Sequence, residues 1–277
     1  MINALPHVSD AGERPSGPSL HAVQFYETDE YLVGAGATFL AAGLAEGRAC
    51  VVLATETHRR QLTNELQRLG FEAGLLGRDD QLVMIDTAQM LAGFMIGGMP
   101  DELLLRASAE PMLRRAAHHS RGGRPLVFGE GVDVLWRGGE RAAALRVEEI
   151  WNDLALHHEM DVLCSYRLDG FARAADTAGF VDVCRAHSAV IPTERFTELS
   201  DEARLLEITK LQQRSRALET EVAKTSRLEL QLRLAFERER KAREALARSE
   251  RSERELLALV ANLLGTGDAA GRPPHDA

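Results

Sequence analysis

Lysine is missing from the first 200 residues, since Lys210, Lys224 and Lys241 all lie further along the chain. A phosphate-binding loop of the Gly-Lys-Ser/Thr type needs a lysine to reach the β- and γ-phosphates of a nucleotide. A Schiff-base enzyme likewise needs a lysine amine. The sequence therefore excludes both kinds of site from residues 1–200.

Cysteine is scarce, and long apolar runs are absent. The cysteines are Cys50, Cys164 and Cys184, an odd number that is typical of a reducing compartment. No apolar stretch approaches the ~18 residues of a membrane span. Residues 1–19 are rich in Pro, Gly and Ser without the apolar segment of a signal peptide, which predicts a disordered leader. We expect a cytoplasmic protein with no membrane association.

Positive charge is in short supply outside one segment. The net charge is −9, but residues 201–254 hold 14 Lys+Arg against 11 Asp+Glu, which leaves −12 for the rest of the chain. Nucleic-acid binding needs a basic surface. The acidic part of the chain therefore argues against direct nucleic-acid binding.

The pattern of the sequence changes near Phe196. Before this residue, short apolar runs alternate with helical patterns, as in a parallel sheet whose strands are buried on both faces. The predicted strands are His21–Tyr26, Ala49–Ala54, Leu82–Ile85, Pro125–Phe128 and Val162–Tyr166. Residues 20–196 thus predict an α/β domain with a mostly parallel sheet of about five or more strands, sandwiched by helices.

After this point, residues 201–264 contain neither Pro nor Gly. Apolar residues such as Leu211, Leu218 and Val222 follow an imperfect heptad phase, which predicts a long coiled-coil helix. Because so polar a helix is marginal alone, we expect a homodimer through residues 201–264. A single charge-laced helix is the alternative. Residues 265–277 are rich in Gly and Pro and are predicted to form a disordered tail.

Ligands of parallel α/β sheets bind at the carboxyl ends of the strands. Glu130 stands between two glycines after a predicted strand, where the backbone can approach a ligand closely. The candidate ligand-binding residues are Tyr26, Glu27, Asp86, Glu130, Asn152, Tyr166 and Arg167. For Asn152, which lies on a predicted helix, a hydrogen bond to the backbone is the alternative.

Cys184 and His187 lie three residues apart, which places them on one face of a predicted helix. Such a pair can share a metal ion or activate the thiol. A closed zinc site needs about four ligands, and His21, Cys164, His157 or His158 could complete one if the fold brings them together. The alternative is a half-buried thiol beside a locally hydrogen-bonded histidine, with His21 in a structural role. The sequence specifies no cofactor.

Several segments of the chain resemble one known family. They are HAVQFYETDEYLVGAGATFLAAGLAEGRACVVLAT, LVMIDTAQMLAGFM, LVFGEGVDVLW, ALRVEEIWNDLA, VLCSYRLDGF and VCRAHSAVIPTERF. In this order they are similar to the MEDS domain, the methanogen/methylotroph sensory domain, over about residues 20–196. The resemblance implies a sensory module with a degenerate RecA/KaiC-like core, found beside helix-turn-helix segments, PAS domains and histidine kinases. One association of the family is with small halogenated hydrocarbons such as dichloromethane.

The chain lacks the residues for ATP hydrolysis and for histidine-kinase activity, two functions that proteins related to this family carry out. The segment Glu27–Gly36, where a RecA-like ATPase would carry its phosphate loop, has no Gly-Lys-Ser/Thr. The only histidine after residue 200 is His275, so the chain lacks a complete histidine kinase.

We therefore predict a non-enzymatic sensory protein. Its α/β domain would receive a small-molecule, redox or protein signal. A dimeric coiled coil would relay that signal to a partner such as a kinase or a transcription regulator. The alternatives are an interaction adaptor without a ligand, and a nucleotide-binding module that does not hydrolyse.

Overall fold

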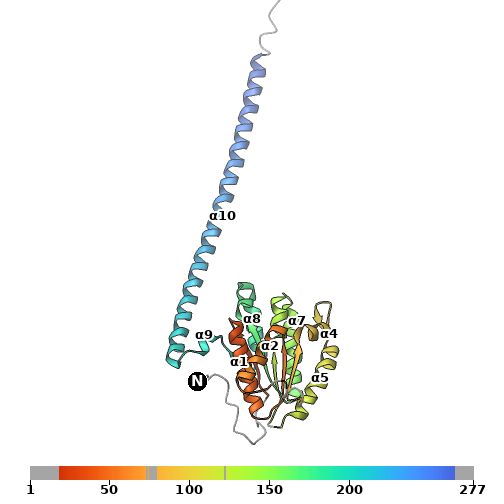
Figure 1. Cartoon of the computed structure of the whole chain (residues 1–277). Coiled ribbons are helices and arrows are strands. Elements are labelled where there is room, and N and C mark those ends of the chain that lie inside the picture. Colours follow the sequence, from red (N-terminus) through yellow and green to blue (C-terminus); the bar gives the residue numbers. More distant parts are fainter. Residues whose placement is uncertain (1–18, 73, 75–79, 122, 266–277) are drawn as a thin grey trace, which may run out of the picture. The chain divides into compact units, whose positions relative to one another are not determined.

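A computed structural model describes residues 19–72, 74, 80–121 and 123–265 (Figure 1). The chain divides after Asp201 into two compact units. The first holds the α/β domain, and the second is formed by the long helix α10 (Asp201–Gly265). The predicted leader (1–19) and tail (265–277) fall almost entirely outside the described residues.

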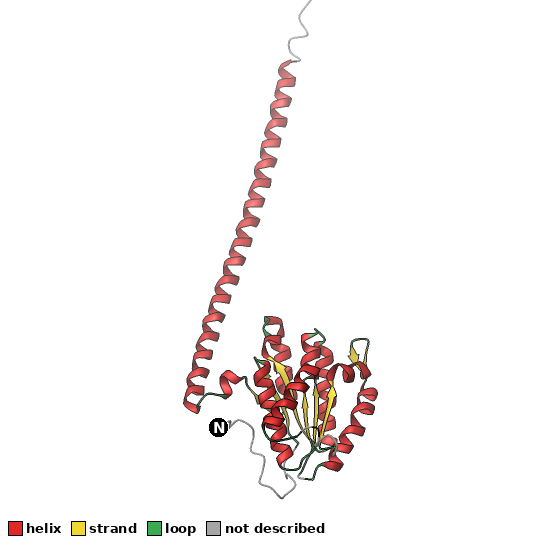
Figure 2. Cartoon of the chain, viewed as in Figure 1, coloured by secondary structure: helices red, strands yellow, loops and turns green. Residues whose placement is uncertain are grey.

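The α/β domain is built on a sheet of six parallel strands (Figure 2). Along the sheet, the order is β3 (Leu82–Asp86), β2 (Cys50–Ala54), β6 (Leu126–Gly129), β7 (Asp161–Arg167), β1 (His21–Tyr26) and β8 (Ala189–Ile191). The predicted parallel α/β fold is confirmed. The sixth strand, β8, pairs with β1 at the edge of the sheet and adds to the five predicted strands.

Helices cover both faces of this sheet (Figures 1 and 2). On one face lie α1 (Asp29–Ala45) and α2 (Glu56–Arg68), and on the other α4 (Thr87–Phe94), α5 (Glu102–His119), α6 (Gly131–Arg137), α7 (Arg141–His157) and α8 (Thr177–Ala186). The shorter elements are the hairpin β4 (Met95–Ile96) and β5 (Met99–Pro100), the 3₁₀ turns Leu168–Phe171 and Ala174–Asp176, and α9 (Glu194–Thr197).

Alternation along each strand divides the core into two layers. Val51 packs into the layer beneath α5 and α7, whereas its neighbour Val52 packs beneath α1 and α2. In β1, Phe25 and Tyr26 divide between the same two layers. Successive strand side chains point to opposite faces, so a sheet covered on both sides needs apolar residues at every position.

Several helices begin directly after a strand, and a side chain caps their first turn. Thr28 caps α1 through Tyr31 N (3.3 Å), Thr55 caps α2 through His58 N (3.4 Å) and Asp86 caps α4 through Gln89 N (3.0 Å). Such caps satisfy backbone N–H groups that the helix cannot pair itself. They hold the residues at the carboxyl edge of the sheet in fixed positions.

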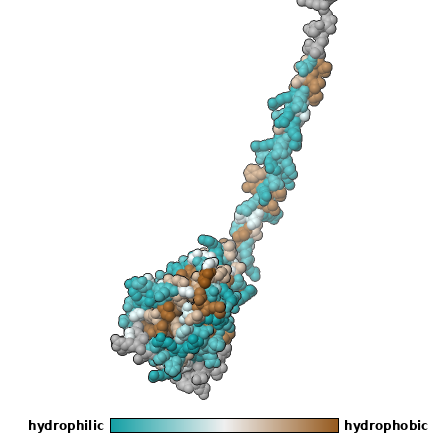
Figure 3. Space-filling model, turned by 90° about the vertical axis from the view of Figure 1, so that its right-hand side faces the viewer, coloured by the Kyte–Doolittle hydropathy of each residue, from teal (hydrophilic) through white to brown (hydrophobic). Residues whose placement is uncertain are grey.

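Helix α10 confirms the predicted long helix over 65 residues. Its heptad residues Leu211, Leu218 and Val222 are exposed in the single chain, and apolar patches interrupt its polar surface (Figure 3). Ion pairs one turn apart, such as Arg243 with Glu239 (2.5 Å), support the helix. Its pairing with a second copy stays a prediction.

None of the described helices combines the length and the apolar character that crossing a lipid bilayer requires.

Close packing of α1 on the sheet yields a first prediction. A Cβ at Gly43 would lie 2.1 Å from Leu126 Cδ1, a buried core atom, whereas a Cβ at Gly34 meets nothing within 4 Å. Both glycines lie inside α1. We expect Gly43→Ala to lower the free energy of unfolding, since overpacking costs about 1–3 kcal/mol and alanine recovers about 1 kcal/mol of helix propensity.

Gly34→Ala is the matched control, and it should leave the domain unchanged or stabilise it by up to about 1 kcal/mol. Urea unfolding followed by tryptophan fluorescence measures both variants. The two tryptophans, Trp136 and Trp151, lie in the α/β domain, so α10 does not contribute to the signal. Equal stabilities of the two variants would contradict the packing argument.

Candidate functional site

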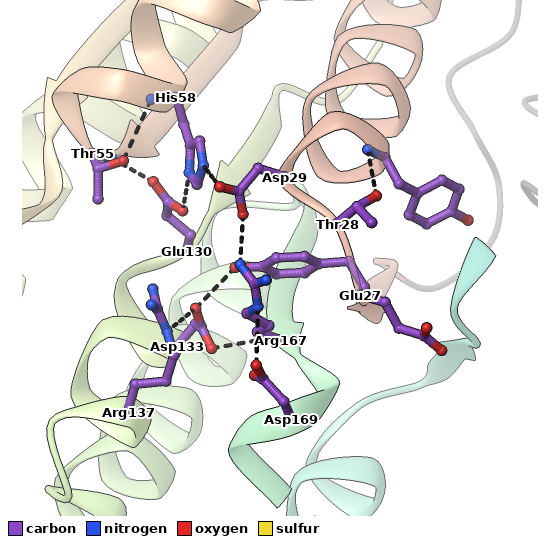
Figure 4. A network of polar contacts seen from close by, with 12 residues as sticks. Glu27, Thr28, Asp29, Thr55, His58, Glu130, Asp133, Arg137, Arg167 and Asp169 are labelled. Carbon is purple, nitrogen blue, oxygen red and sulfur yellow. Dashed lines mark hydrogen bonds and ion pairs between the residues drawn. The ribbon is translucent and has the colours of Figure 1, made fainter. Parts of the chain in front are cut away.

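A polar network lies at the carboxyl edge of the sheet (Figure 4). Its deepest member, Glu130, follows β6 and is completely buried. One oxygen of Glu130 accepts a short hydrogen bond from the backbone N–H of Thr55, and the other lies 2.6 Å from Nδ1 of His58. The carboxylate thus joins the end of β6 to the first turn of α2.

The network continues through an acidic residue to an arginine (Figure 4). Nε2 of His58 lies 3.8 Å from Asp29, whose other oxygen accepts a hydrogen bond from Arg167 Nη1 at 2.8 Å. The guanidinium of Arg167 lies 6.0 Å from the ring centroid of Tyr26, within the range of a cation–π contact. Arg167 therefore bridges the ends of β1 and β7.

Asp133, on α6, gathers three donors although its side chain is fully buried. It accepts hydrogen bonds from the hydroxyl of Tyr26 (3.0 Å), from Nε of Arg137 (2.8 Å) and from the backbone N–H of Arg167 (3.0 Å). Burial raises the pKa of Asp133 even though these donors oppose the shift. The pKa of Tyr26 is also raised, by burial and by the nearby Asp133 carboxylate.

We call the polar network at the carboxyl edge the rim network; it comprises Tyr26, Asp29, His58, Glu130, Asp133, Arg137 and Arg167.

The predicted ligand-binding residues divide between several places. Tyr26, Glu130 and Arg167 meet in the network at the carboxyl edge, as the strand ends indicated. Asp86 instead caps α4 and pairs with Arg59 at 2.8 Å. Glu27 accepts from Thr193 Oγ1 (3.2 Å), just before α9.

The grouping of Tyr166 with Glu130 is wrong. Tyr166 pairs in register with Phe25, whereas Arg167 pairs with Tyr26, so Tyr166 points to the opposite face of the sheet. There its hydroxyl donates to Glu148 at 2.9 Å.

His58 and Asp133 belong to the network but were not among the residues predicted from the sequence. His58 lies three residues after the cap residue Thr55, and Asp133 three residues after Glu130. Thr55 and Glu130 immediately precede α2 and α6, and residues three apart in a helix lie on the same face. This spacing was the sequence signal that could have indicated His58 and Asp133.

A second polar group lies inside the domain on the other face. His21, Glu148, Cys164 and His187 each direct one ligand-type atom inward, and these four atoms lie within 4.8 Å of one another. Oε2 of Glu148 lies 3.4 Å from Nε2 of His21, 3.3 Å from Nε2 of His187 and 3.3 Å from Sγ of Cys164. All four residues are buried. We call them the His-Cys-Glu cluster.

Outer contacts orient three members of the His-Cys-Glu cluster. Nδ1 of His21 lies 3.4 Å from Oδ1 of Asn152, and Nδ1 of His187 donates to the carbonyl of Val183 at 2.7 Å. The hydroxyl of Tyr166 donates to the second oxygen of Glu148. Asn152 and Tyr166, two of the predicted ligand-binding residues, therefore contact this cluster and not the rim network.

Burial alone would raise the pKa of Glu148, but the His187 and His21 imidazoles outweigh it and hold that pKa well below its ordinary value. For His187, burial lowers the pKa, and the Glu148 carboxylate reverses the effect so that the net shift is upward. Burial and the same carboxylate raise the pKa of the Cys164 thiol well above its usual range. The cluster therefore favours a carboxylate beside an imidazolium and a neutral thiol.

The predicted placement of Cys184 and His187 on one helix face is wrong. Helix α8 ends at Ala186, and His187 has extended backbone angles (φ −114°, ψ 147°). This change of direction turns the imidazole toward Glu148, while Cys184 stays half-buried on α8. Three of the four predicted metal or redox residues, His21, Cys164 and His187, do come together.

An apolar pocket reaches the same cluster. Its lining comes from strands β2, β6 and β7 and helices α4, α6 and α7, and comprises Leu53, Thr87, Met90, Leu91, Phe94, Val127, Gly129, Gly131, Val132, Val147, Trp151, Val162 and Cys164. The centre of a water-sized group can occupy about 30 Å³ of this pocket. The Thr87 hydroxyl is buried and has no hydrogen-bond partner among the described residues.

A known protein family matches the part of the chain that contains these sites. The family model described as MEDS, the MEthanogen/methylotroph, DcmR Sensory domain, matches residues 20–188. The search of curated proteins finds no match. The rim network, the pocket and the His-Cys-Glu cluster all lie within the matched residues.

The contact between His58 and Glu130 predicts a pH-dependent contribution to stability. The hydrogen bond to Glu130 raises the pKa of His58 above its ordinary value of about 6.5, more than burial lowers it. A raised folded-state pKa contributes stability that is complete below the unfolded pKa and is lost as the pH rises through the folded one. His58→Gln should therefore destabilise the domain by about 1–3 kcal/mol in mild acid and by less in alkali.

Urea unfolding of wild type and His58→Gln at about pH 6 and about pH 9 measures this difference. The exposed His118 on α5 provides the control variant His118→Gln. A cost of His58→Gln that is the same at both pH values would contradict the assigned ion pair.

Proposed function

Since the chain belongs to the MEDS family of sensory domains, we propose that it is a non-enzymatic signalling protein whose α/β domain binds a small, mainly apolar molecule. The observation that carries this proposal is the pocket between the sheet and α4. Two copies of α10 pair as a dimer, and this dimer transmits the presence of ligand in the pocket to a partner regulator or kinase.

The chemistry of the pocket supports an apolar ligand. Apart from Thr87 and Cys164, its lining offers only apolar side chains and glycines. A lining of this kind with a few polar groups is typical of small-molecule sites. The small volume suits a ligand of a few heavy atoms. Small halogenated hydrocarbons, with which the family is associated, fit this description.

A nucleotide fits less well. Only Glu27 and Thr28 separate β1 from α1, and both Gly34 and Gly36 lie inside that helix, so no glycine loop is available to cradle phosphates. The nearby rim carries the carboxylates of Asp29 and Glu130, which repel phosphate groups.

Contacts of Glu194 support a route from the sheet toward α10. The Glu194 carboxylate accepts from the backbone N–H groups of Glu27 (3.0 Å) and Thr28 (2.9 Å) and from the Thr28 hydroxyl (2.8 Å). The hydroxyls of Tyr31 and Thr197 lie 2.8 Å apart. These contacts tie α9 to the carboxyl end of β1, next to Tyr26 of the rim network.

An adaptor without a ligand is the second candidate. Ile96, Met99, Leu103 and Leu104, around the β4–β5 hairpin and the start of α5, are exposed. Figure 3 views the α4–α5 side of the domain and shows apolar surface there. Exposed apolar patches of this kind often bind proteins. Failure of the pocket to bind any small apolar molecule would favour this function.

Filling the pocket tests the ligand. A Cβ at Gly129, a pocket residue, meets nothing within 4 Å, so Gly129→Val places a side chain where the pocket lining has none. We expect it to weaken binding of dibromomethane at least tenfold, or about 1.4 kcal/mol. Heavy bromine atoms quench tryptophan emission, and Trp151 lines the pocket. Titration of the full chain with dibromomethane, followed by fluorescence, measures the affinity.

Gly34→Val, on α1 at the other face of the sheet, is the control, because a Cβ there also meets open space. Saturable quenching of wild type and of Gly34→Val, lost in Gly129→Val, supports the proposal. Quenching that is linear and equal in all three proteins would exclude the pocket as the site.

Coupling is tested by hydrogen exchange on residues 196–230, with and without saturating dibromomethane. We expect the ligand to change the protection of this segment in wild type. A ligand that prefers one conformation of α9 and the start of α10 shifts the population toward that conformation. Glu194→Ala should abolish the change by removing three hydrogen bonds. Glu198→Ala, at an exposed neighbouring position, should keep it. Unchanged protection in ligand-saturated wild type would refute transmission through this junction.

A further inference from the structure

The His-Cys-Glu cluster brings four ligands of three chemical types together from distant parts of the chain. His21 begins β1, Glu148 lies on α7, Cys164 lies in β7 and His187 follows α8. Imidazole, thiolate and carboxylate are the side chains that bind zinc in proteins. Residues so far apart in sequence meet only because the sheet order places β1 beside β7 and α8 returns across them.

Four of the six separations within the cluster match those of a tetrahedral site, and all six are within 4.8 Å. Zn–N bonds of ~2.0 Å and Zn–S bonds of ~2.3 Å place neighbouring ligand atoms about 3.3–3.8 Å apart. Oε2 of Glu148 lies 3.4, 3.3 and 3.3 Å from the ligand atoms of His21, His187 and Cys164, and Sγ of Cys164 lies 3.5 Å from Nε2 of His21. One ion could contact all four without a large movement of the backbone.

Hydrogen-bonding contacts at the Nδ1 atoms of His187 and His21 orient the two imidazoles for metal binding. Because Nδ1 of His187 donates to Val183, and Nδ1 of His21 faces Asn152, each ring directs Nε2 inward. Metal-bound histidines usually donate their other nitrogen in this way. Nε2 of His187 is buried and makes no well-oriented hydrogen bond among the described residues, although Glu148 lies 3.3 Å away. This nitrogen, which faces the Glu148 carboxylate without a well-oriented hydrogen bond, is in position to bind a shared ion.

We propose that His21, Glu148, Cys164 and His187 bind one divalent transition-metal ion, with zinc as the preferred ion. Two imidazoles, one thiolate and one carboxylate in a closed tetrahedron favour zinc over calcium or magnesium, which prefer oxygen ligands. On binding, the Cys164 thiol and Nε2 of His187 release their protons to solvent. The site goes beyond the proposed function and does not depend on a ligand in the pocket.

The position of Cys164 links the metal site to the pocket. This residue contributes Sγ to the cluster and also lines the apolar pocket. A metal ion at the cluster would hold one wall of the pocket in place.

Cobalt spectroscopy of the full-length chain is the decisive experiment, since it needs no variant that might unfold. Protein is stripped with a chelator, checked for folding by circular dichroism, and titrated with Co²⁺. We expect a sulfur-to-cobalt charge-transfer band and the intense ligand-field bands of a tetrahedral site, saturating at one ion per chain. Zinc should then displace the cobalt and raise the melting temperature. Folded wild type without a thiolate band would overturn the proposal.

Variants then identify the ligands. Cys164→Ser should lose the charge-transfer band, whereas Cys184→Ser, on α8 outside the cluster, should keep it. Asn152→Ala should weaken cobalt affinity by about 10–100-fold through loss of the contact with His21. A band that survives in Cys164→Ser or disappears in Cys184→Ser would overturn the ligand set.

Discussion

The alternation of side chains along β1 and β7 determines how this domain is organised. Because the two strands are parallel and in register, Phe25 faces Tyr166 on one side of the sheet, and Tyr26 faces Arg167 on the other. Tyr26 of the rim network and Tyr166, which contacts the His-Cys-Glu cluster, therefore point to opposite faces of the sheet. A shift of register by one residue would exchange the two faces and break both groups.

Among the described residues of this domain, the carboxylates of Glu130, Asp133 and Glu148 are completely buried. Burial of a charge is costly unless the charge is paired and hydrogen-bonded. Each of the three has a cationic or titratable neighbour, namely His58, Arg137 and His187. Apolar residues could often fill such positions at less cost.

The two halves of the proposed mechanism rest on different kinds of evidence. Family membership supports sensing, and the apolar pocket supports a small ligand. The connection to α10 rests on the contacts of Glu194 with the end of β1, which place α9 next to the rim network. The proposed dimer follows from the heptad pattern of α10, and the proposed partner follows from the resemblance to sensory modules that act beside kinases and regulators.

The sequence by itself determined the fold class and the long helix, because apolar runs and a segment without Pro or Gly are local patterns. It also identified His21, Cys164 and His187, since their chemistry is visible without a fold. Only the tertiary structure decided which residues meet. It replaced Cys184 with Glu148 because α8 ends before His187, and it separated Tyr166 from Glu130 because strand neighbours face opposite sides. Contacts between distant segments depend on sheet order and register, which no local pattern encodes.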